Sequence, residues 1–387
     1  LDDAGASVPA GYAKAVIGTI GPATAEEAAA SKGRVQVGDL TGLSGLQQSQ
    51  DAVLAGTPGV EVVAVGGQGN GPTRTIKTYP STPGTSITVT LDQRIQLAAE
   101  AAVAATSTPS ALVAIRVSTG DILAVANGPS GSAGYNRAML GKYPPGSTFK
   151  VASALAYLEK GLTPDTVVAC PPTIVVGKKF QNAEGEALGS VPFRSDFAHS
   201  CNTAFVGQST TVTAAELTAA AASLGYRTLD LGIPAFGGSV PLTDSTTEHA
   251  ANAIGQGKVE ASPLAVALAS ASVANGSSLN PRLIVDPAHP DPVPGPGLPP
   301  TQIAQLREMM RAVVTSGTGS AVEGIPGGDV YGKTGTAEFG TEDPPQTHAW
   351  FTGYQGDIAF AVLVEDGGFG GRVAAPIAAR FLTSLAG

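Results

Sequence analysis

Apolar segments of strand length stand on both sides of a long stretch without them, and this constrains the fold more than any other feature. Residues 111–117 and 121–126 form one pair around a Ser-Thr-Gly turn. Residues 331–339, 349–354 and 358–365 form a second group near the C-terminus. Because links of hairpin length separate the strands within each group, neighbouring strands are predicted to be antiparallel.

The stretch between the two groups, residues 161–330, is predicted to contain mainly helices and loops, with a Pro-rich surface connection at 287–300. Helical spacing of apolar residues flanks the strand groups at 92–105, 147–159 and 374–385. The two groups are therefore expected to share one antiparallel sheet flanked by helices, which is an α/β fold of the α+β type.

The first part of the chain is more broken by Gly and Pro and is predicted to form a separate, smaller domain at 1–83, followed by a larger domain at 84–387. A turn-rich joint at 66–72 lies within the smaller domain. The elements predicted there are strands at 15–20 and 60–65 and helices at 24–32 and 43–54.

Charge and composition exclude several classes of function. The net charge is −9 without a block of like charges, which argues against nucleic acid as a partner. Two cysteines and four scattered histidines lack the spacing of metal ligands, so no metal site is expected. No apolar run approaches the roughly 20 residues of a membrane helix. Since the chain begins at Leu1, we expect a processed or truncated form whose missing N-terminal segment carried a signal or an anchor.

Ser147 and Lys150 form a Ser-x-x-Lys pair that directly follows Pro-Pro-Gly. Residues three apart share one face of a helix, so the hydroxyl and the amine can meet. The N-terminus of a helix also favours negative charge developing on the serine oxygen. Lysine acts as a base only when burial or a second cation lowers its pKa. The alternative is a serine in a first helical turn beside a solvated lysine.

A Lys-Thr-Gly-Thr run, Lys333 to Thr336, begins the first of the C-terminal strands. Lys333 can supply the second cation, and the hydroxyls of Thr334 and Thr336 can hold a carboxylate. Gly335 leaves room for a substrate backbone along the strand. The segment 327–334 also fits the phosphate-binding pattern G-x-x-x-x-G-K-[ST], but that loop requires a following helix and the sequence here does not predict one.

Ser200 and Asn202 form a Ser-x-Asn triplet between the two lysine motifs. The hydroxyl can relay a proton and the amide can hold a peptide carbonyl. A second copy of the triplet begins at Ser278, in a turn before Pro281, where a structural role suits it better. We prefer the copy at Ser200 because its segment has helical apolar spacing.

With the three motifs in this order, the chain resembles the penicillin-binding proteins, in which this motif set occurs, as it does in class A β-lactamases. The likeness covers roughly residues 85–387. The first 83 residues resemble the end of the pedestal domain of the monofunctional, class B members, except that Gln47 stands where the pedestal motif has Glu, so that a hydrogen bond is expected in place of an ion pair. Further stretches that carry the likeness are 136–138, 143–150, 254–257, 262–264, 316–319, 332–337, 348–351 and 374–377.

The resemblance implies a peptidoglycan D,D-transpeptidase with a penicillin-binding fold and without a cofactor. Ser147 would attack a D-Ala-D-Ala stem peptide and Lys150 would take its proton. The backbone N–H groups of Ser147 and Thr336 would form the oxyanion hole. Ser200 would relay the proton to the leaving D-Ala. The remaining roles would be orientation of the acyl amide by Asn202 and binding of the terminal carboxylate by Lys333, Thr334 and Thr336.

The resemblance also implies a place in the cell and a set of partners. The protein would stand on the extracytoplasmic face of the bacterial plasma membrane, would be acylated by β-lactams and would act with other cell-wall synthesis proteins. Cys170 and Cys201 would then form a disulfide beside the cleft, or else remain two buried thiols. A D,D-carboxypeptidase or β-lactamase-type hydrolase and a non-catalytic β-lactam sensor stay open as alternatives.

Overall fold

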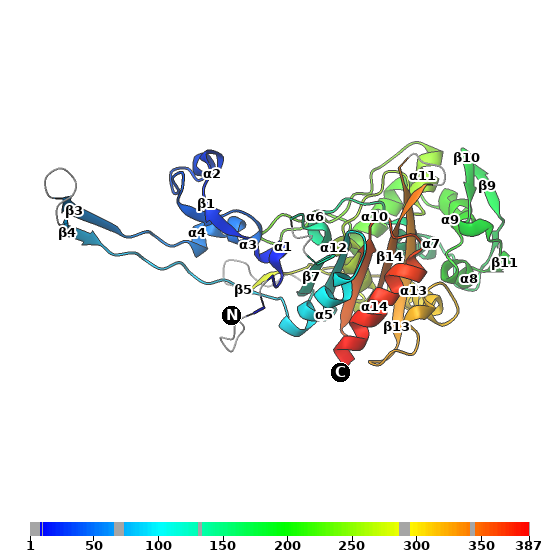
Figure 1. The fold of residues 1–387 in the computed structure, drawn as a ribbon. Coiled ribbons are helices and arrows are strands. Elements are labelled where there is room, and N and C mark those ends of the chain that lie inside the picture. The colour runs from blue at the N-terminus through cyan, green and yellow to red at the C-terminus, as the bar shows by residue number, and fades with distance from the viewer. Residues whose placement is uncertain are drawn as a thin grey trace. The chain divides into compact units, whose positions relative to one another are not determined.

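The computed structural model describes residues 8–9, 11–65, 73–130, 134–285, 295–340 and 345–386 (Figure 1). The chain divides into two compact units. The larger unit comprises Leu1–Ala15, Thr90–Leu283 and Asp291–Gly387, and the smaller comprises Val16–Val89 and Ile284–Pro290. By this division residues 84–89, which the sequence predicts to be part of the larger domain, fall in the smaller unit.

The larger unit is built on one five-stranded antiparallel sheet in the order β13-β14-β15-β6-β7. The prediction that both strand groups share a sheet is therefore confirmed. The junction lies between β15 and β6, where Ile358 pairs with Arg116 and Val364 with Ser110. The strands are β6 (Ser110–Arg116), β7 (Ile122–Gly128), β13 (Val330–Phe339), β14 (Gln346–Gln355) and β15 (Ile358–Val364).

Helices pack against this sheet because its central strands are apolar on both faces. α5 (Gln93–Ala104) and α14 (Gly370–Ala386) join β6, β7, β14 and β15 in one core cluster. α12 (Pro263–Asn275) packs against β6, β14 and β15 as well. Eleven of its thirteen residues are buried, as expected of a helix that is apolar all round. Figure 1 shows α14 in red and α5 in cyan beside the strands.

The inserted region carries the helices that surround the site and four short strands that the sequence did not predict. β8 (Val167–Cys170) pairs with β11 (Gly189–Pro192), and β9 (Thr173–Val176) with β10 (Lys178–Gln181). Each strand has only four residues, too few for a clear alternating pattern. The helices are α6 (Arg137–Leu140), α7 (Lys150–Glu159), α8 (Phe193–Ala198), α9 (Asn202–Gln208), α10 (Ala214–Leu224), α11 (Thr246–Asn252) and α13 (Pro300–Thr315).

The smaller unit confirms two of the elements predicted for the first 83 residues. The strand at 60–65 is β3 (Val60–Val65), and α2 (Ala25–Ala30) begins with a capping box formed by Thr24 and Glu27. The remaining elements assigned here are β1 (Ile20–Pro22), β2 (Leu40–Gly42), α3 (Gly45–Ser49), α4 (Asp51–Leu54), β4 (Thr73–Tyr79), β5 (Thr88–Val89) and β12 (Ile284–Val285).

Two predictions for this region are wrong. The strand expected at 15–20 does not form, since the short helix α1 (Lys14–Ile17) is followed by Gly18 at φ +86°. The helix expected at 43–54 is divided into α3 and α4 at Gln50. The turn-rich segment 66–72 and most of the Pro-rich connection at 287–300 lie outside the described residues.

The hydrogen bond expected at Gln47 does not form within the described part of the chain. Its side chain has no hydrogen-bond partner among the described residues, and the ion pair of this segment joins Arg34 to Asp51. Asp51 also accepts a hydrogen bond from the Gly42 backbone N–H. Within the described part of the chain, no helix combines the length and the apolar character needed to cross a membrane.

Candidate active site

Ser147 lies on a tight turn that two glycines hold in place. Residues Gly146–Phe149 form a 3-10 helix that leads directly into α7. Gly146 has φ +52° and donates its N–H to the Gly255 carbonyl over 2.9 Å. A Cβ on Gly255 would stand only 1.9 Å from the Gly146 carbonyl oxygen. The close approach of these two glycines therefore fixes the turn that presents the partly buried Ser147 hydroxyl at the start of a helix.

Lys150 follows on the next turn, and its side chain is completely buried. Its ammonium donates to the Ser200 carbonyl and to Asn202 Oδ1, both at 2.7 Å, and to Ser200 Oγ at 3.3 Å. Among the described residues it has no hydrogen bond to Ser147. The structure thus brings Lys150, Ser200 and Asn202 together around one amine.

Both lysines of the site have lowered pKa values. Burial lowers the pKa of Lys150 well below its ordinary value, and the charge of Lys333 lowers it further. Burial also lowers the pKa of Lys333 to about 7. Each amine lies over an aromatic ring, Lys150 5.2 Å from the Phe205 centroid and Lys333 5.6 Å from that of Phe197. A neutral amine able to accept a proton is therefore accessible at Lys150 near neutral pH.

The helical spacing predicted through Ser200 is interrupted in the structure. α8 ends at Ala198 and α9 begins at Asn202, and between them Ser200 adopts φ +63°. The Cys201 sulfur accepts a hydrogen bond from the Ala204 N–H and so caps α9. This break turns the Ser200 hydroxyl and carbonyl and the Asn202 amide toward Lys150.

Replacing Ser200 by Gly is expected to leave the protein more stable than replacing it by Ala. The left-handed conformation costs a residue with a Cβ roughly 1–2 kcal/mol, and the larger unfolded-state entropy of Gly cancels part of the gain. We expect a difference of about 1 kcal/mol in the free energy of unfolding, measured by urea denaturation. Both variants lose the hydroxyl, so the comparison isolates the backbone. Equal stabilities would contradict the strain at this position.

Cys170 and Cys201 form a disulfide with an S–S distance of 2.09 Å. It joins the end of β8 to the loop that carries Ser200, directly before Asn202 at the start of α9. The two sulfurs and a carboxylate oxygen of Asp196 lie within 4.8 Å of one another. Because the sulfurs are bonded to each other, they are not thiolates available to a metal ion.

Strand β13 forms one edge of the sheet and carries the Lys-Thr-Gly-Thr run. Thr334 and Thr336 face the cleft, while Lys333 and Gly335 are buried behind it. A Cβ on Gly335 would lie 2.9 Å from Thr148 Cγ2 and 3.0 Å from Trp350 Cβ. Gly335 therefore allows β13 to pack closely against the turn of Ser147. The phosphate-loop alternative does not fit, since 330–339 is strand.

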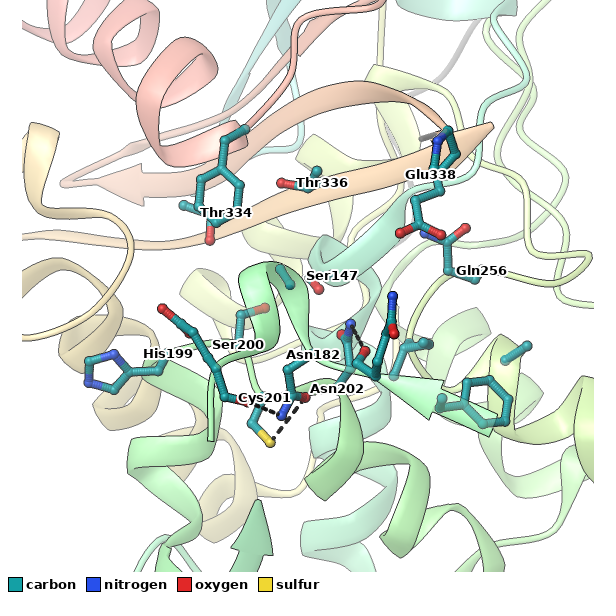
Figure 2. Close-up of a pocket in the computed structure, with 18 of the residues that line it drawn as sticks. Ser147, Asn182, His199, Ser200, Cys201, Asn202, Gln256, Thr334, Thr336 and Glu338 are labelled. Atoms are coloured by element: carbon teal, nitrogen blue, oxygen red, sulfur yellow. Dashed lines mark hydrogen bonds between the residues drawn. The ribbon is translucent and has the colours of Figure 1, made fainter. Parts of the chain in front are cut away.

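The cleft has a volume of about 670 Å³. Thr334 and Thr336 lie on one side and Ser200 and Asn202 on the other, with Ser147 between them (Figure 2). Several further polar residues that line the cleft lie outside the three motifs, although some belong to stretches that carry the family likeness. These are Lys178, Lys179, Gln181, Asn182, Glu186, His199, Gln256, Thr318 and Glu338.

The second Ser-x-Asn copy has a structural role. Arg227 donates to the Leu279 carbonyl and to Asn280 Oδ1, and Ser278 is buried. The first copy is therefore the one that contacts the buried Lys150.

Two family models match the chain. The model described as the penicillin binding protein transpeptidase domain matches residues 110–383, and the one described as the penicillin-binding protein dimerisation domain matches residues 8–89. The chain therefore belongs to the penicillin-binding protein family, and the two domains in this order are those of its class B members.

Named relatives and solved structures agree with this assignment. The peptidoglycan D,D-transpeptidase PbpA of Mycolicibacterium smegmatis is 35% identical over 278 residues, 62% of this chain and 55% of that protein. The chain thus spans little more than half of this relative. One chain in a structure of a peptidoglycan synthase complex is similar to this chain, with a TM-score of 0.82 at 27% identity. The likeness covers 96% of this chain and 74% of that chain. The penicillin G acyl-enzyme of penicillin-binding protein A from Mycobacterium tuberculosis has a TM-score of 0.68 at 29% identity, covering 79% and 81%.

Proposed function

We propose that this protein is a peptidoglycan D,D-transpeptidase that cross-links stem peptides through an acyl-enzyme on Ser147. The observation that carries the proposal is the fully buried Lys150, which has a lowered pKa and lies one helical turn after Ser147. An amine of this kind can be neutral near pH 7 and remove the proton of a serine hydroxyl.

In the first half of the reaction, Ser147 Oγ attacks the carbonyl of the penultimate D-Ala, and its proton passes to Lys150. Backbone N–H groups of Ser147 and Thr336 stabilise the oxyanion, each contributing roughly 3–4 kcal/mol by analogy with other acyl-transfer enzymes. The amide bond to the terminal D-Ala then breaks, and the amine that leaves receives a proton through Ser200. Ser200 suits this relay because its hydroxyl lies 3.3 Å from the Lys150 amine.

The terminal carboxylate binds the hydroxyls of Thr334 and Thr336, which line the cleft. Lys333 acts on this carboxylate from behind the strand through its charge, because its side chain is buried and donates to the Thr334 carbonyl at 3.2 Å. Asn202 orients the acyl amide. In the second half, the amine of another stem peptide attacks the acyl-enzyme, releasing Ser147 and forming the cross-link.

The proposal extends to partners and location. The likeness to a structure of a peptidoglycan synthase complex supports other cell-wall synthesis proteins as partners. The likeness to a penicillin G acyl-enzyme supports β-lactams as ligands that acylate Ser147. A transpeptidase must meet its substrate on the extracytoplasmic face of the plasma membrane, and we propose that location together with an N-terminal anchor. A disulfide suits such an oxidising compartment.

Intact mass after a brief incubation with benzylpenicillin tests the proposal. We expect an adduct of one drug mass on the wild-type protein, located on the Ser147 peptide, and no adduct on Ser147→Ala. A stable adduct supports a transpeptidase whose acyl-enzyme deacylates slowly. Hydrolysed drug without an adduct would point to a β-lactamase-type hydrolase, and an unmodified protein with intact drug would overturn the acyl-enzyme.

A stable adduct alone does not separate a transpeptidase from a D,D-carboxypeptidase or a β-lactam sensor. Incubation with a D-Ala-D-Ala stem peptide and an acceptor amine separates them by product. Cross-linked peptide supports the proposal, D-Ala release without cross-linking indicates a carboxypeptidase, and no turnover indicates a sensor.

A further inference from the structure

Glu338 is a charged residue of the cleft that none of the proposed steps uses. It lies on β13, two positions after Thr336, and its exposed side chain lines the same cleft as Ser147. Its carboxylate has no hydrogen-bond or ion-pair partner among the described residues. A carboxylate left open in the cleft of the reacting serine can act on the charge of whatever the cleft binds.

Strand β13 presents its three polar cleft residues in a row. Thr334, Thr336 and Glu338 alternate with buried residues, and the pairing of β13 with β14 is regular through all three positions. Successive residues on one face of a strand are about 6.7 Å apart. Figure 2 shows the three side chains in this order along the strand, with Glu338 furthest from Thr334. Their order therefore sets the order of the substrate groups that they meet.

The proposed reaction gives a bound substrate one direction along β13. Its terminal carboxylate lies at Thr334 and Thr336, and its reacting carbonyl lies at the backbone N–H groups of Ser147 and Thr336. The acyl part then continues away from Thr334, toward Glu338. Among the described strands β13 is at the edge of its sheet, so an extended peptide can pair with it in the antiparallel direction. The residue before D-Ala-D-Ala therefore lies near Glu338.

The opposite wall of the cleft carries charges of both signs. β10 lies on that side, since its Gln181 carbonyl accepts a hydrogen bond from Asn202 Nδ2 over 3.2 Å. Lys178 and Lys179 lie on β10, and Glu186 follows it in the lining of the cleft. Within the described part of the chain, no ion pair joins these groups to β13. The wall formed by the strand itself therefore acts on a substrate with the negative charge of Glu338.

We propose that Glu338 is a specificity-determining residue that favours acyl donors with a positive charge on the acyl group. The matching substrate is a stem peptide whose residue before D-Ala-D-Ala carries a protonated side-chain amine. In a partly exposed cleft, a carboxylate attracts an ammonium and repels a second carboxylate, and salt weakens both effects. The inference rests on the proposed function, because the direction of the substrate along β13 comes from it.

Three penicillins with the same core test this charge preference. At the carbon next to the side-chain carbonyl, benzylpenicillin carries hydrogen, ampicillin an ammonium and carbenicillin a carboxylate. This acyl side chain takes the place of the residue before D-Ala-D-Ala. Second-order rate constants of acylation are measured by intact mass at pH 6.5, where the ampicillin amine is mostly protonated. Each is divided by the benzylpenicillin value of the same variant, so that a general loss of activity cancels.

We expect the ratio of the ampicillin to the carbenicillin rate constant to fall about five-fold in Glu338→Gln and about as much again in Glu338→Lys. High salt should narrow these differences. Glu323→Gln is the matched control, because it removes the same charge from an exposed glutamate outside the cleft. It should keep the wild-type ratio.

The outcomes separate failure of this inference from failure of the proposed function. An unchanged ratio in both Glu338 variants would overturn the inference, while the benzylpenicillin adduct would still support the acyl-enzyme. An equal fall in Glu323→Gln would assign the effect to the net charge of the protein and would also overturn it. Absence of an adduct with all three penicillins would overturn the proposed function, and the inference would fail with it.

A pair of donor peptides extends the test to the substrate. One ends in Lys-D-Ala-D-Ala, and the other has Nε-acetyl-lysine in the same place, which removes the charge but keeps the side-chain stem. With an acceptor amine present, we expect wild type to release D-Ala from the lysine peptide about three-fold faster, and Glu338→Gln to treat the two peptides alike. Equal rates in wild type, or a preference that persists in Glu338→Gln, would overturn the assignment to Glu338.

Discussion

Replacing Lys150 by Met is expected to lower the rate of acylation by benzylpenicillin about a thousand-fold. The fully buried amine belongs to the residue one helical turn after Ser147 and lies 3.3 Å from Ser200 Oγ. Met has similar length and packs where the lysine stem packs, but it cannot accept a proton. Loss of a general base typically lowers a rate 10²–10⁴-fold.

The same substitution is expected to preserve the fold. Because the folded-state pKa of Lys150 is lowered, the folded protein binds fewer protons than the unfolded chain between that pKa and the ordinary value of 10.5. The free energy of unfolding of the wild type therefore decreases as the pH falls toward the folded-state pKa. The stability of Lys150→Met relative to wild type should increase over the same range. Urea denaturation at several pH values measures this.

Lys160→Met is the matched control for Lys150→Met. Lys160 lies at the end of the same helix, is partly exposed and pairs with Glu216 on the surface. Its loss should leave the acylation rate at the wild-type level. Acylation of Lys150→Met at the wild-type rate would show that another group removes the proton.

Removing the disulfide by Cys170→Ser is expected to lower the free energy of unfolding by about 4 kcal/mol. The bond closes a loop with a sequence separation of 31 residues, and the loss of chain entropy in the unfolded state gives a value of this size. Cys170 is the better position to replace, because Cys201 also caps α9. Urea denaturation with and without dithiothreitol gives the measurement.

Reduction provides the control for this variant. Wild type in reductant should approach the stability of Cys170→Ser, and the variant itself should not respond to reductant. The acylation rate should fall in both cases, because the loop between Cys201 and α8 holds Ser200 in its left-handed conformation. A variant within about 1 kcal/mol of oxidised wild type would contradict a stabilising role for the bond.

The sequence predicted the parts of the site that depend on local spacing. Ser147 and Lys150 are one helical turn apart, and Thr334 and Thr336 alternate with Lys333 along one strand, so their relative placement follows from the geometry of a helix and a strand. The single sheet shared by both strand groups could be predicted because all of its strands are apolar runs. The strand patterns are strong because each extends over a continuous run of apolar residues.

Features that depend on tertiary contacts could not be predicted in this way. Asp196 looks like an ordinary helical carboxylate, yet the fold buries it completely, and its carboxylate has no hydrogen-bond partner among the described residues. Ser200 lies in apolar spacing typical of a helix, yet the backbone breaks there. The strand expected at 15–20 has suitable residues, but Gly18 packs against Ser44 in a backbone conformation that ends the segment.

The pairing of β15 with β6 also determines when the sheet can be completed during folding. β6 and β7 lie early in the larger unit, but β6 has its second neighbour only when residues 358–364 arrive. Until then an apolar strand edge is open to other chains, which is a hazard for aggregation. Pairing over such a sequence distance is also slow. The strand that carries Lys333 joins the sheet through β14 and β15, so the sheet that holds the site cannot be completed before residues 358–364 are made.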